Sequence, residues 1–316
     1  MNGAYAETCA AIGSVMWNWR MLGLGGEARY ADLIEHTLYN AVLPGVSLKG
    51  QHYFYQNPLA DDGSHRRQPW FGCACCPSNV ARLLATLPGY FYGTSDGAVW
   101  VHLYAEGAVT IELDENRIFR LRQRTRYPWD GRVEIDVEAK GEFALMLRVP
   151  SWCEEDATVE VNGESVDARI SLGSYMEIRC AWRSGDTVNL HLPMPVRRIE
   201  CHPYVAENAG RVALMRGPLL YCVEQVDNHG VDLRDLVLND KEPTVRFEPD
   251  LLGGVAVLQA EARLAAPDNG WEDRLYRTLH PRERDTQTYP TRVTLVPYYA
   301  WANREPGKMR VWLRNG

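Results

Sequence analysis

Three cysteines and one glutamate in the first quarter of the chain have side chains that could bind a metal ion. Glu7 and Cys9 are separated by one residue, and Cys75 and Cys76 are adjacent. Three thiolates and one carboxylate make a tetrahedral ligand set that suits Zn²⁺. Two alternatives stay open from the spacing alone. A zinc ion could be purely structural, because four protein ligands normally close a site, or the cysteines could pack as small apolar groups without a metal.

The spacing also constrains the backbone that carries these side chains. In the middle of a helix, Glu7 and Cys9 would point about 200° apart and could not share an ion. In an extended segment they point the same way, so residues 5–9 are expected to form the extended entry to a helix. The two adjacent cysteines stand just before Pro77, and proline suits the first position of a helix. Free amides and the positive end of the helix dipole would stabilise thiolates there.

Apolar residues with helical spacing predict three helices within residues 1–90. The first ends at a cluster of glycines, the second runs from about Glu27 to Leu43, and the third runs from Pro77 to about Leu87. The apolar positions of the first helix are Cys9, Ile12, Met16, Trp19 and Leu22, and core-facing positions of the second include Leu33, Leu38 and Val42. Three helices cannot bury all the aromatic side chains of this region, so either the following β-domains or further helices are expected to cover them.

From Tyr90 onward the pattern changes to the alternation that is typical of β-strands. Short β-branched or aromatic segments are separated by turn pairs such as Asn162-Gly163. This pattern predicts an antiparallel β-sandwich over residues 91–196. Closely spaced prolines mark a boundary near residue 196, and further strand-like segments predict a second antiparallel β-sandwich domain over residues 197–316. The expected fold class is multidomain α plus β.

Composition excludes several classes of protein. The 316 residues are 46% hydrophobic and 24% charged, which is ordinary for a globular chain. A formal net charge of −7 without a basic run argues against nucleic acid as a partner. No apolar stretch approaches the ~20 residues needed to span a bilayer, and the N-terminus lacks a signal-peptide pattern, so no membrane partner and a cytoplasmic location are expected. The clustering of the eight cysteines favours metal or thiol chemistry in a reducing compartment, with an all-disulfide protein as the alternative.

Six motifs spread over the whole chain are similar to those of one enzyme family. They are Tyr5-Ala6-Glu7-Thr8-Cys9-Ala10-Ala11, Glu35-His36-Thr37-Leu38-Tyr39-Asn40, Tyr53–Leu59, Trp70–Asn79, Gly217–Tyr221 and Pro297–Arg304. This set resembles the non-reducing-end β-L-arabinofuranosidases of glycoside hydrolase family 127. The pairing of Glu-Thr-Cys with Cys-Cys-Pro is the most specific part of the resemblance.

The resemblance implies a zinc-dependent retaining glycosidase that acts on an arabinofuranose-containing oligosaccharide or glycoconjugate. Residues 1–90 would be the C-terminal helices of an (α/α)6 barrel. The implied zinc ligands are Glu7, Cys9, Cys75 and Cys76. Cys75 would be the nucleophile, and Glu35 and Tyr55 would contact the arabinofuranose ring. Cys73 lies in the motif but is not a family ligand, so it is expected to be a packed thiol.

The resemblance also reveals a departure from the family. The general acid/base of the family is a glutamate some way before the Glu-Thr-Cys motif, and only six residues, none of them acidic, precede Glu7. The chain is therefore expected to be N-terminally truncated and to lack activity alone. The alternative is a non-catalytic protein in which a structural zinc ion holds the helices together and the β-domains bind carbohydrate or a subunit. A different furanoside as substrate and a homodimeric state are compatible with the same sequence.

Overall fold

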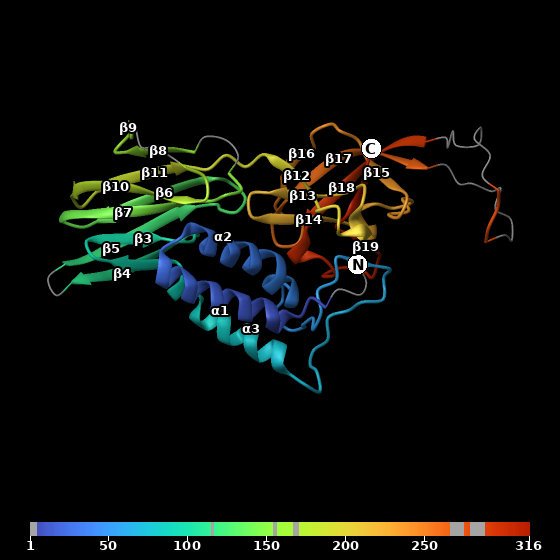
Figure 1. The fold of residues 1–316 in the computed structure, drawn as a ribbon, viewed down its shortest axis with the longest axis horizontal. Coiled ribbons are helices and arrows are strands. Elements are labelled where there is room, and N and C mark those ends of the chain that lie inside the picture. The colour runs from blue at the N-terminus through green and yellow to red at the C-terminus, as the bar shows by residue number, and fades with distance from the viewer. Residues whose placement is uncertain (1–4, 115–116, 154–156, 167–170, 266–274, 279–287) are drawn as a thin grey trace.

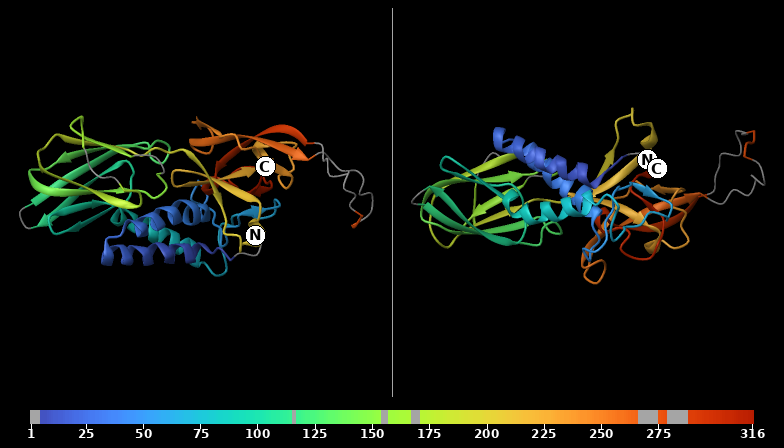
Figure 2. Two further views of the ribbon diagram at one scale, coloured as in Figure 1. Left: turned by 45° about the horizontal axis from the view of Figure 1, so that its top comes forward. Right: turned by 90° about the horizontal axis from the view of Figure 1, so that it is seen from below.

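The computed structural model describes residues 5–114, 117–153, 157–166, 171–265, 275–278 and 288–316. Helices α1, α2 and α3 lie along one side, below the junction of two groups of strands that follow one another along the longest axis (Figure 1). Two further views show the same arrangement from other directions (Figure 2). The protein is thus mostly β-structure with few helices. None of the helices in the described ranges is long and apolar enough to cross a membrane.

The first two helices form where the sequence predicts them. Helix α1 (Thr8–Gly25) ends at Gly26, whose left-handed backbone (φ 64°) lets its N–H donate to the Leu22 carbonyl, a common ending for a helix. Helix α2 (Ala28–Thr37) continues as a π-helical turn, η1 (Leu38–Val42), and a 3-10 turn, η2 (Leu43–Gly45). Leu38 and Val42 are buried as predicted, whereas Leu33 is 47% exposed.

Helix α3 (Cys75–Thr86) begins two residues earlier than the sequence predicts, and the 3-10 turn η3 (Leu87–Tyr90) follows it. Pro77 therefore occupies the third helical position and not the first. Proline is tolerated there because the N–H groups of the first turn have no partner within the helix. As a consequence, Cys75 and Cys76 are the first two residues of the helix.

Two sheets follow the helices and share one core. The four-stranded sheet has the order β10-β7-β3-β2, and the six-stranded sheet has the order β4-β5-β6-β11-β8-β9. Their strands are β2 (Tyr92–Ser95), β3 (Ala98–Val101), β4 (Gly107–Asp114), β5 (Arg117–Thr125), β6 (Arg132–Glu138), β7 (Gly141–Val149), β8 (Thr158–Val161), β9 (Glu164–Ser165), β10 (Ser174–Trp182) and β11 (Asp186–His191). Side chains of both sheets, such as Leu145 and Ile135, pack in this core. The predicted antiparallel pairing fails between β3 and β7, which run parallel because the chain visits the other sheet between them.

The remaining strands form one ten-stranded sheet and not the predicted second sandwich. They are β1 (Ala60–Asp61), β12 (Val196–Glu200), β13 (Arg211–Arg216), β14 (Leu219–Glu224), β15 (Leu236–Leu238), β16 (Thr244–Glu248), β17 (Val255–Ala265), β18 (Thr288–Pro297), β19 (Met309–Arg310) and β20 (Leu313–Asn315), with 3-10 turns η4 (Ala206–Asn208), η5 (Gln225–Asp227) and η8 (Tyr298–Ala300). The path β14-β18-β17-β15-β20-β13 closes on itself because β13 also pairs with β14. Leu214 and Tyr221 belong to one core of this closed sheet, and Ala213 and Cys222 belong to another. The continuous apolar runs of β13 and β14 are consistent with burial on both faces, but they do not reveal closure of the sheet.

The helical segment is fastened to the closed sheet by a buried asparagine. Asn40 Nδ2 donates to the Pro218 carbonyl at 2.8 Å, and the Leu220 N–H donates to Asn40 Oδ1 at 2.8 Å. Strand β1 also pairs with β19 near the C-terminus. The helices that carry the candidate site therefore rest on a β-scaffold made from the other end of the chain.

Candidate metal centre

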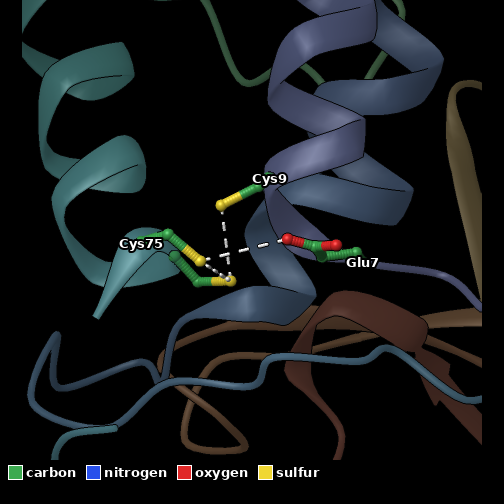
Figure 3. Close-up of side chains that lie close together, drawn as sticks. Glu7, Cys9 and Cys75 are labelled. Carbon is green, nitrogen blue, oxygen red and sulfur yellow. Dashed lines mark hydrogen bonds between the residues drawn. The ribbon is translucent and has the colours of Figure 1, made fainter. Parts of the chain in front are cut away.

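The four predicted ligands converge where the N-terminal ends of α1 and α3 meet (Figure 3). One ligand atom of each lies within 4.8 Å of the others. Cys9 Sγ is 3.5 Å from Cys76 Sγ. Cys75 Sγ is 3.8 Å from Cys76 Sγ and 4.0 Å from Glu7 Oε1. This group of one glutamate and three cysteines, referred to below as the thiol-carboxylate cluster, could hold a metal ion.

The chemistry and the spacing of the donor atoms fit a tetrahedral ion. Two sulfurs bound at about 2.3 Å to one zinc ion lie about 3.8 Å apart when the angle is tetrahedral. The observed separations of 3.5 and 3.8 Å are close to that value. Burial, together with the sulfurs of Cys9 and Cys75 beside it, raises the pKa of the Cys76 thiol. A divalent cation would offset this effect, because it stabilises the thiolate that it binds.

A strand-like contact holds Glu7 in the extended conformation that places it beside the cysteines. Glu7 has φ −76° and ψ 135°, and it forms an isolated β-bridge with Gln56. The next N–H, that of Thr8, donates to the Tyr55 carbonyl at 3.0 Å. The helix begins at Thr8, so the predicted extended entry is shorter than expected and Cys9 already lies in the first turn.

A buried threonine sets the position of both neighbouring ligands. Thr8 Oγ1 donates to the Phe54 carbonyl at 2.9 Å and accepts from Asn57 Nδ2 at 3.0 Å. Gly45 leaves the room that Thr8 needs, since a Cβ at Gly45 would lie 2.7 Å from Thr8 Cγ2 and 2.7 Å from Thr8 Oγ1. The residues on either side of Thr8 are Glu7 and Cys9, so displacement of Thr8 would displace both.

Gly45→Ala is therefore expected to destabilise the protein by about 1–3 kcal/mol, because the added methyl group overpacks a fully buried side chain. Urea unfolding measures this loss, and the same measurement with added zinc tests whether stabilisation by a metal is lost as well. Gly13→Ala is the matched control. Apart from the backbone of α1 itself, no atom of the described residues lies within 4 Å of a Cβ added at Gly13 in α1, so this change should stabilise the helix by about 0.5–1 kcal/mol. Equal effects of the two substitutions would contradict the packing argument.

Asn79, one turn into α3, supports the cluster from outside, because its Nδ2 donates to Cys9 Sγ at 3.0 Å. Hydrogen bonds of this kind stabilise a thiolate and would orient it toward a bound ion. We expect Asn79→Ala to weaken zinc affinity about tenfold, measured by competition with a chromophoric chelator. Ser78→Ala is the control, since the Ser78 hydroxyl contacts only carbonyls of its own helix end among the described residues. A zinc affinity that is unchanged in Asn79→Ala would refute this role.

Tyr55 lies beside the thiol-carboxylate cluster. Its hydroxyl accepts a hydrogen bond from the Tyr5 hydroxyl at 3.1 Å, and its ring meets Phe71 edge to face at 6.1 Å between centroids. The hydrogen bond with Tyr5, desolvation and the nearby carboxylate of Glu7 raise the pKa of Tyr55. Tyr55 is thus a neutral hydroxyl next to the cluster at neutral pH.

Glu35 lies away from the cluster, in the contact between α2 and the two-sheet body. Its Oε1 accepts from Tyr127 Oη and from Arg148 Nη2, both at 2.6 Å, and its Oε2 accepts from Trp152 Nε1 at 3.0 Å. No hydrogen bond between described residues joins Glu35 to the cluster. Sequence reasoning missed Arg148, which also pairs with Asp32 at 2.5 Å. A single arginine inside the apolar run of β7 is the signal that could have indicated a buried ion pair.

The other cysteines take no part in the cluster. Cys73 is exposed, so the expectation of a packed thiol is wrong. It lies in the loop that leads into α3, and the other described elements leave it exposed. All eight cysteines are free thiols, which excludes the all-disulfide alternative.

Comparison with known proteins covers almost the whole chain. Residues 1–89 match the family profile described as beta-L-arabinofuranosidase, GH127 catalytic domain. Residues 98–194 match the GH127 middle domain and residues 196–314 the glycoside hydrolase family 127 C-terminal domain. The non-reducing end beta-L-arabinofuranosidase of Bifidobacterium longum subsp. longum is 37% identical over an alignment of 334 positions, which covers 98% of this chain and 49% of that protein. The chain spans about half the length of this curated relative.

Solved structures agree with the sequence comparison. A GH127 beta-L-arabinofuranosidase from Geobacillus stearothermophilus T6 has 43% sequence identity and a TM-score of 0.90, over 99% of this chain and 50% of that one. A structure described as a glycoside hydrolase has 35% identity and a TM-score of 0.92, over 99% of this chain and 52% of that one.

Proposed function

Because the chain belongs to glycoside hydrolase family 127, we propose that it carries the metal site and the nucleophile of a zinc-dependent retaining glycosidase that releases β-L-arabinofuranose from non-reducing ends. One observation supports this proposal above all: Cys75 Sγ lies within the thiol-carboxylate cluster, 4.0 Å from a carboxylate oxygen. A cysteine that merely filled a core would have no need of a carboxylate partner.

The proposed zinc ligands are Glu7, Cys9, Cys75 and Cys76. A free thiol has a pKa of about 8.5 and is mostly protonated near neutral pH. Bound zinc would keep the sulfurs as thiolates at that pH. The backbone adds to this effect, since Cys75 is the first residue of α3 and lies at the positive end of the helix dipole.

Cys75 is the proposed nucleophile. Its Sγ donates an electron pair to the anomeric carbon, and the new C–S bond forms as the bond from that carbon to the leaving oxygen breaks. A general acid protonates the leaving oxygen. The same group then takes a proton from water, whose oxygen displaces Cys75 and releases the sugar. Two successive displacements at one carbon give net retention of configuration.

The general acid/base must come from outside the cluster. Among the described residues, the cluster contains one carboxylate, that of Glu7. We assign this carboxylate to the metal. We assign the general acid/base role to a helical segment that corresponds to the half of the relatives' length that this chain does not cover. Trp17 and Leu24 of α1 and Leu84 of α3 support that assignment, because they are 68%, 83% and 43% exposed and offer an apolar surface to further helices of an (α/α)6 barrel. The chain alone is then expected to bind zinc without hydrolysing the glycoside.

Tyr55 is the proposed contact to the arabinofuranose ring of an oligosaccharide or glycoconjugate, because its neutral hydroxyl stands next to Cys75 and Glu7. Glu35 as a second sugar contact rests on the resemblance alone. Its three hydrogen bonds favour a different task, which is to fix α2 on the two-sheet body.

Covalent labelling tests the proposal on the chain as it stands. The zinc-loaded protein is incubated with a bromoacetamide of β-L-arabinofuranosylamine, and the adduct is located by peptide mass spectrometry. An adduct on Cys75 is expected, and Cys75→Ser should lose that adduct whether or not the exposed thiol of Cys73 is also alkylated. Cys73→Ser is the control and should keep the Cys75 adduct, because Cys73 is outside the cluster. A zinc-loaded protein labelled only at Cys73 would favour a non-catalytic, zinc-stapled carbohydrate-binding or subunit-binding protein.

A further inference from the structure

A cavity of about 580 Å³ lies between the helical segment and the closed sheet. Its wall comes from segments that are distant in sequence, namely the loop 47–52, residues 66–67, residues 250–253 and residues 302–304. No residue of the thiol-carboxylate cluster lines it. The volume lies within the usual range for small-molecule sites.

The wall of this cavity has an excess of positive charge. Lys49, Arg66 and Arg67 line it, and none of the ion pairs between described residues includes any of them. The guanidinium of Arg66 donates to backbone carbonyls. A fourth cation of the wall, Arg304, is already neutralised by carboxylates behind it. The described lining contains one carboxylate, Asp250, so an anion would meet more positive than negative charge.

Arg67 is the most informative of these cations, because it is only 8% exposed. Its Nη1 donates to the carbonyls of Trp301 at 2.8 Å and Ala302 at 3.1 Å, and its Nε and Nη2 donate to the Pro44 carbonyl. Burial lowers the pKa of Arg67 to about 10, so it stays a cation at neutral pH. Backbone dipoles offset part of the desolvation of a buried charge, and an anion in the adjoining cavity would offset more.

Two residues with strained backbone line the same cavity. Leu252 has φ 52° and Ala302 has φ 55°, a region that favours glycine. Hydrogen bonds keep Ala302 in this strained conformation. Its N–H donates to Glu224 Oε1 at 2.9 Å, and Arg304 Nη2 donates to the other oxygen of Glu224 at 2.7 Å. Strain that is locked by its surroundings is concentrated at binding sites. The wall is therefore preorganised.

From these observations together, we propose that the cavity binds an oxyanion, a carboxylate or a phosphate group, on a sugar-sized ligand. Lys49 and Arg66 contact the oxyanion directly, and Arg67 stabilises it from within the wall. Leu48 and Leu251 supply apolar surface beside it. This inference does not depend on the hydrolytic function proposed above.

Isothermal titration calorimetry of the whole chain at low salt tests the proposal with three probes: D-galacturonate, inorganic phosphate and the neutral sugar D-galactose. At least one oxyanion is expected to bind in a one-to-one ratio, and galactose is not. Binding of galacturonate identifies an acidic sugar, and binding of phosphate alone identifies a phosphate group. The charge reversal Lys49→Glu with Arg66→Glu should raise the Kd at least about tenfold. Lys140→Glu, an exposed lysine in the turn between β6 and β7, is the matched control and should leave the Kd unchanged.

Three results would each overturn the proposal: no saturable binding of either oxyanion, binding of galactose as tight as that of galacturonate, or a Kd that Lys140→Glu raises as much as the double reversal does. Thermal unfolding shows whether the double variant folds. If it does not fold, Lys49→Ala and Arg66→Ala are measured singly, because each only removes a charge near the surface.

Discussion

Replacing Cys75 by serine, in an enzyme that has the full length of the relatives, is expected to lower kcat by about 10⁴-fold or more. A serine hydroxyl is far less acidic than a thiol and has no base assigned to it in the cluster, so it cannot replace the thiolate in the attack on the anomeric carbon. Release of nitrophenol from nitrophenyl β-L-arabinofuranoside measures the loss.

Cys73→Ser is the control for that experiment. Cys73 is exposed and two residues from Cys75, so its replacement should leave turnover unchanged. The zinc content of each variant is measured alongside, because loss of the nucleophile and loss of the metal predict different contents. A Cys75→Ser enzyme that kept more than about a tenth of the parental kcat would refute the assignment of the nucleophile, because removal of a nucleophile lowers kcat by several orders of magnitude.

Replacing Arg148 by methionine is expected to lower the free energy of unfolding by about 3–5 kcal/mol. Arg148 is fully buried, and its guanidinium binds Asp32 at 2.5 Å and Glu35 at 2.6 Å. Without it, the carboxylate of Glu35, which is 2% exposed, would lose its one ion pair among the described residues. Urea unfolding followed by tryptophan fluorescence measures the change, and Trp152 reports locally because its indole N–H donates to Glu35.

Arg124→Met is the control for the buried ion pair. Arg124 also binds two carboxylates, those of Glu134 and Asp136, but its side chain is 46% exposed. Surface ion pairs of this kind contribute about 0–1 kcal/mol, so the expected loss is small. If Arg148→Met and Arg124→Met lowered the free energy of unfolding equally, the buried pair would not be what fastens α2 to the two-sheet body.

Only part of the candidate metal centre was predictable from local spacing, because the approach of Cys9 to Cys76 joins residues 67 positions apart in sequence. A glutamate and a cysteine two residues apart can share an ion only if the backbone between them leaves the helix, and Glu7 is indeed extended while the helix begins at the next residue. The start of α3 was misplaced by two residues because proline is acceptable at any position of the first turn.

The partners of Glu35 were not predictable in the same way. Arg148 is 113 residues away in sequence, and no periodicity within α2 or β7 indicates which buried charge meets which. The exposed position of Cys73 has the same origin, since burial in a loop depends on whether another element covers it.

By itself, the amino-acid sequence indicated the residues of the candidate metal centre, the helical or strand-like character of each segment and the family resemblance, because residue type and local periodicity are properties of neighbouring residues. The tertiary structure alone decided that β13 and β14 close the last sheet, that Glu35 faces Arg148, and that loops from both halves of the chain line a basic cavity. These features depend on contacts between residues far apart in the chain, and a local pattern does not encode which of many possible contacts form.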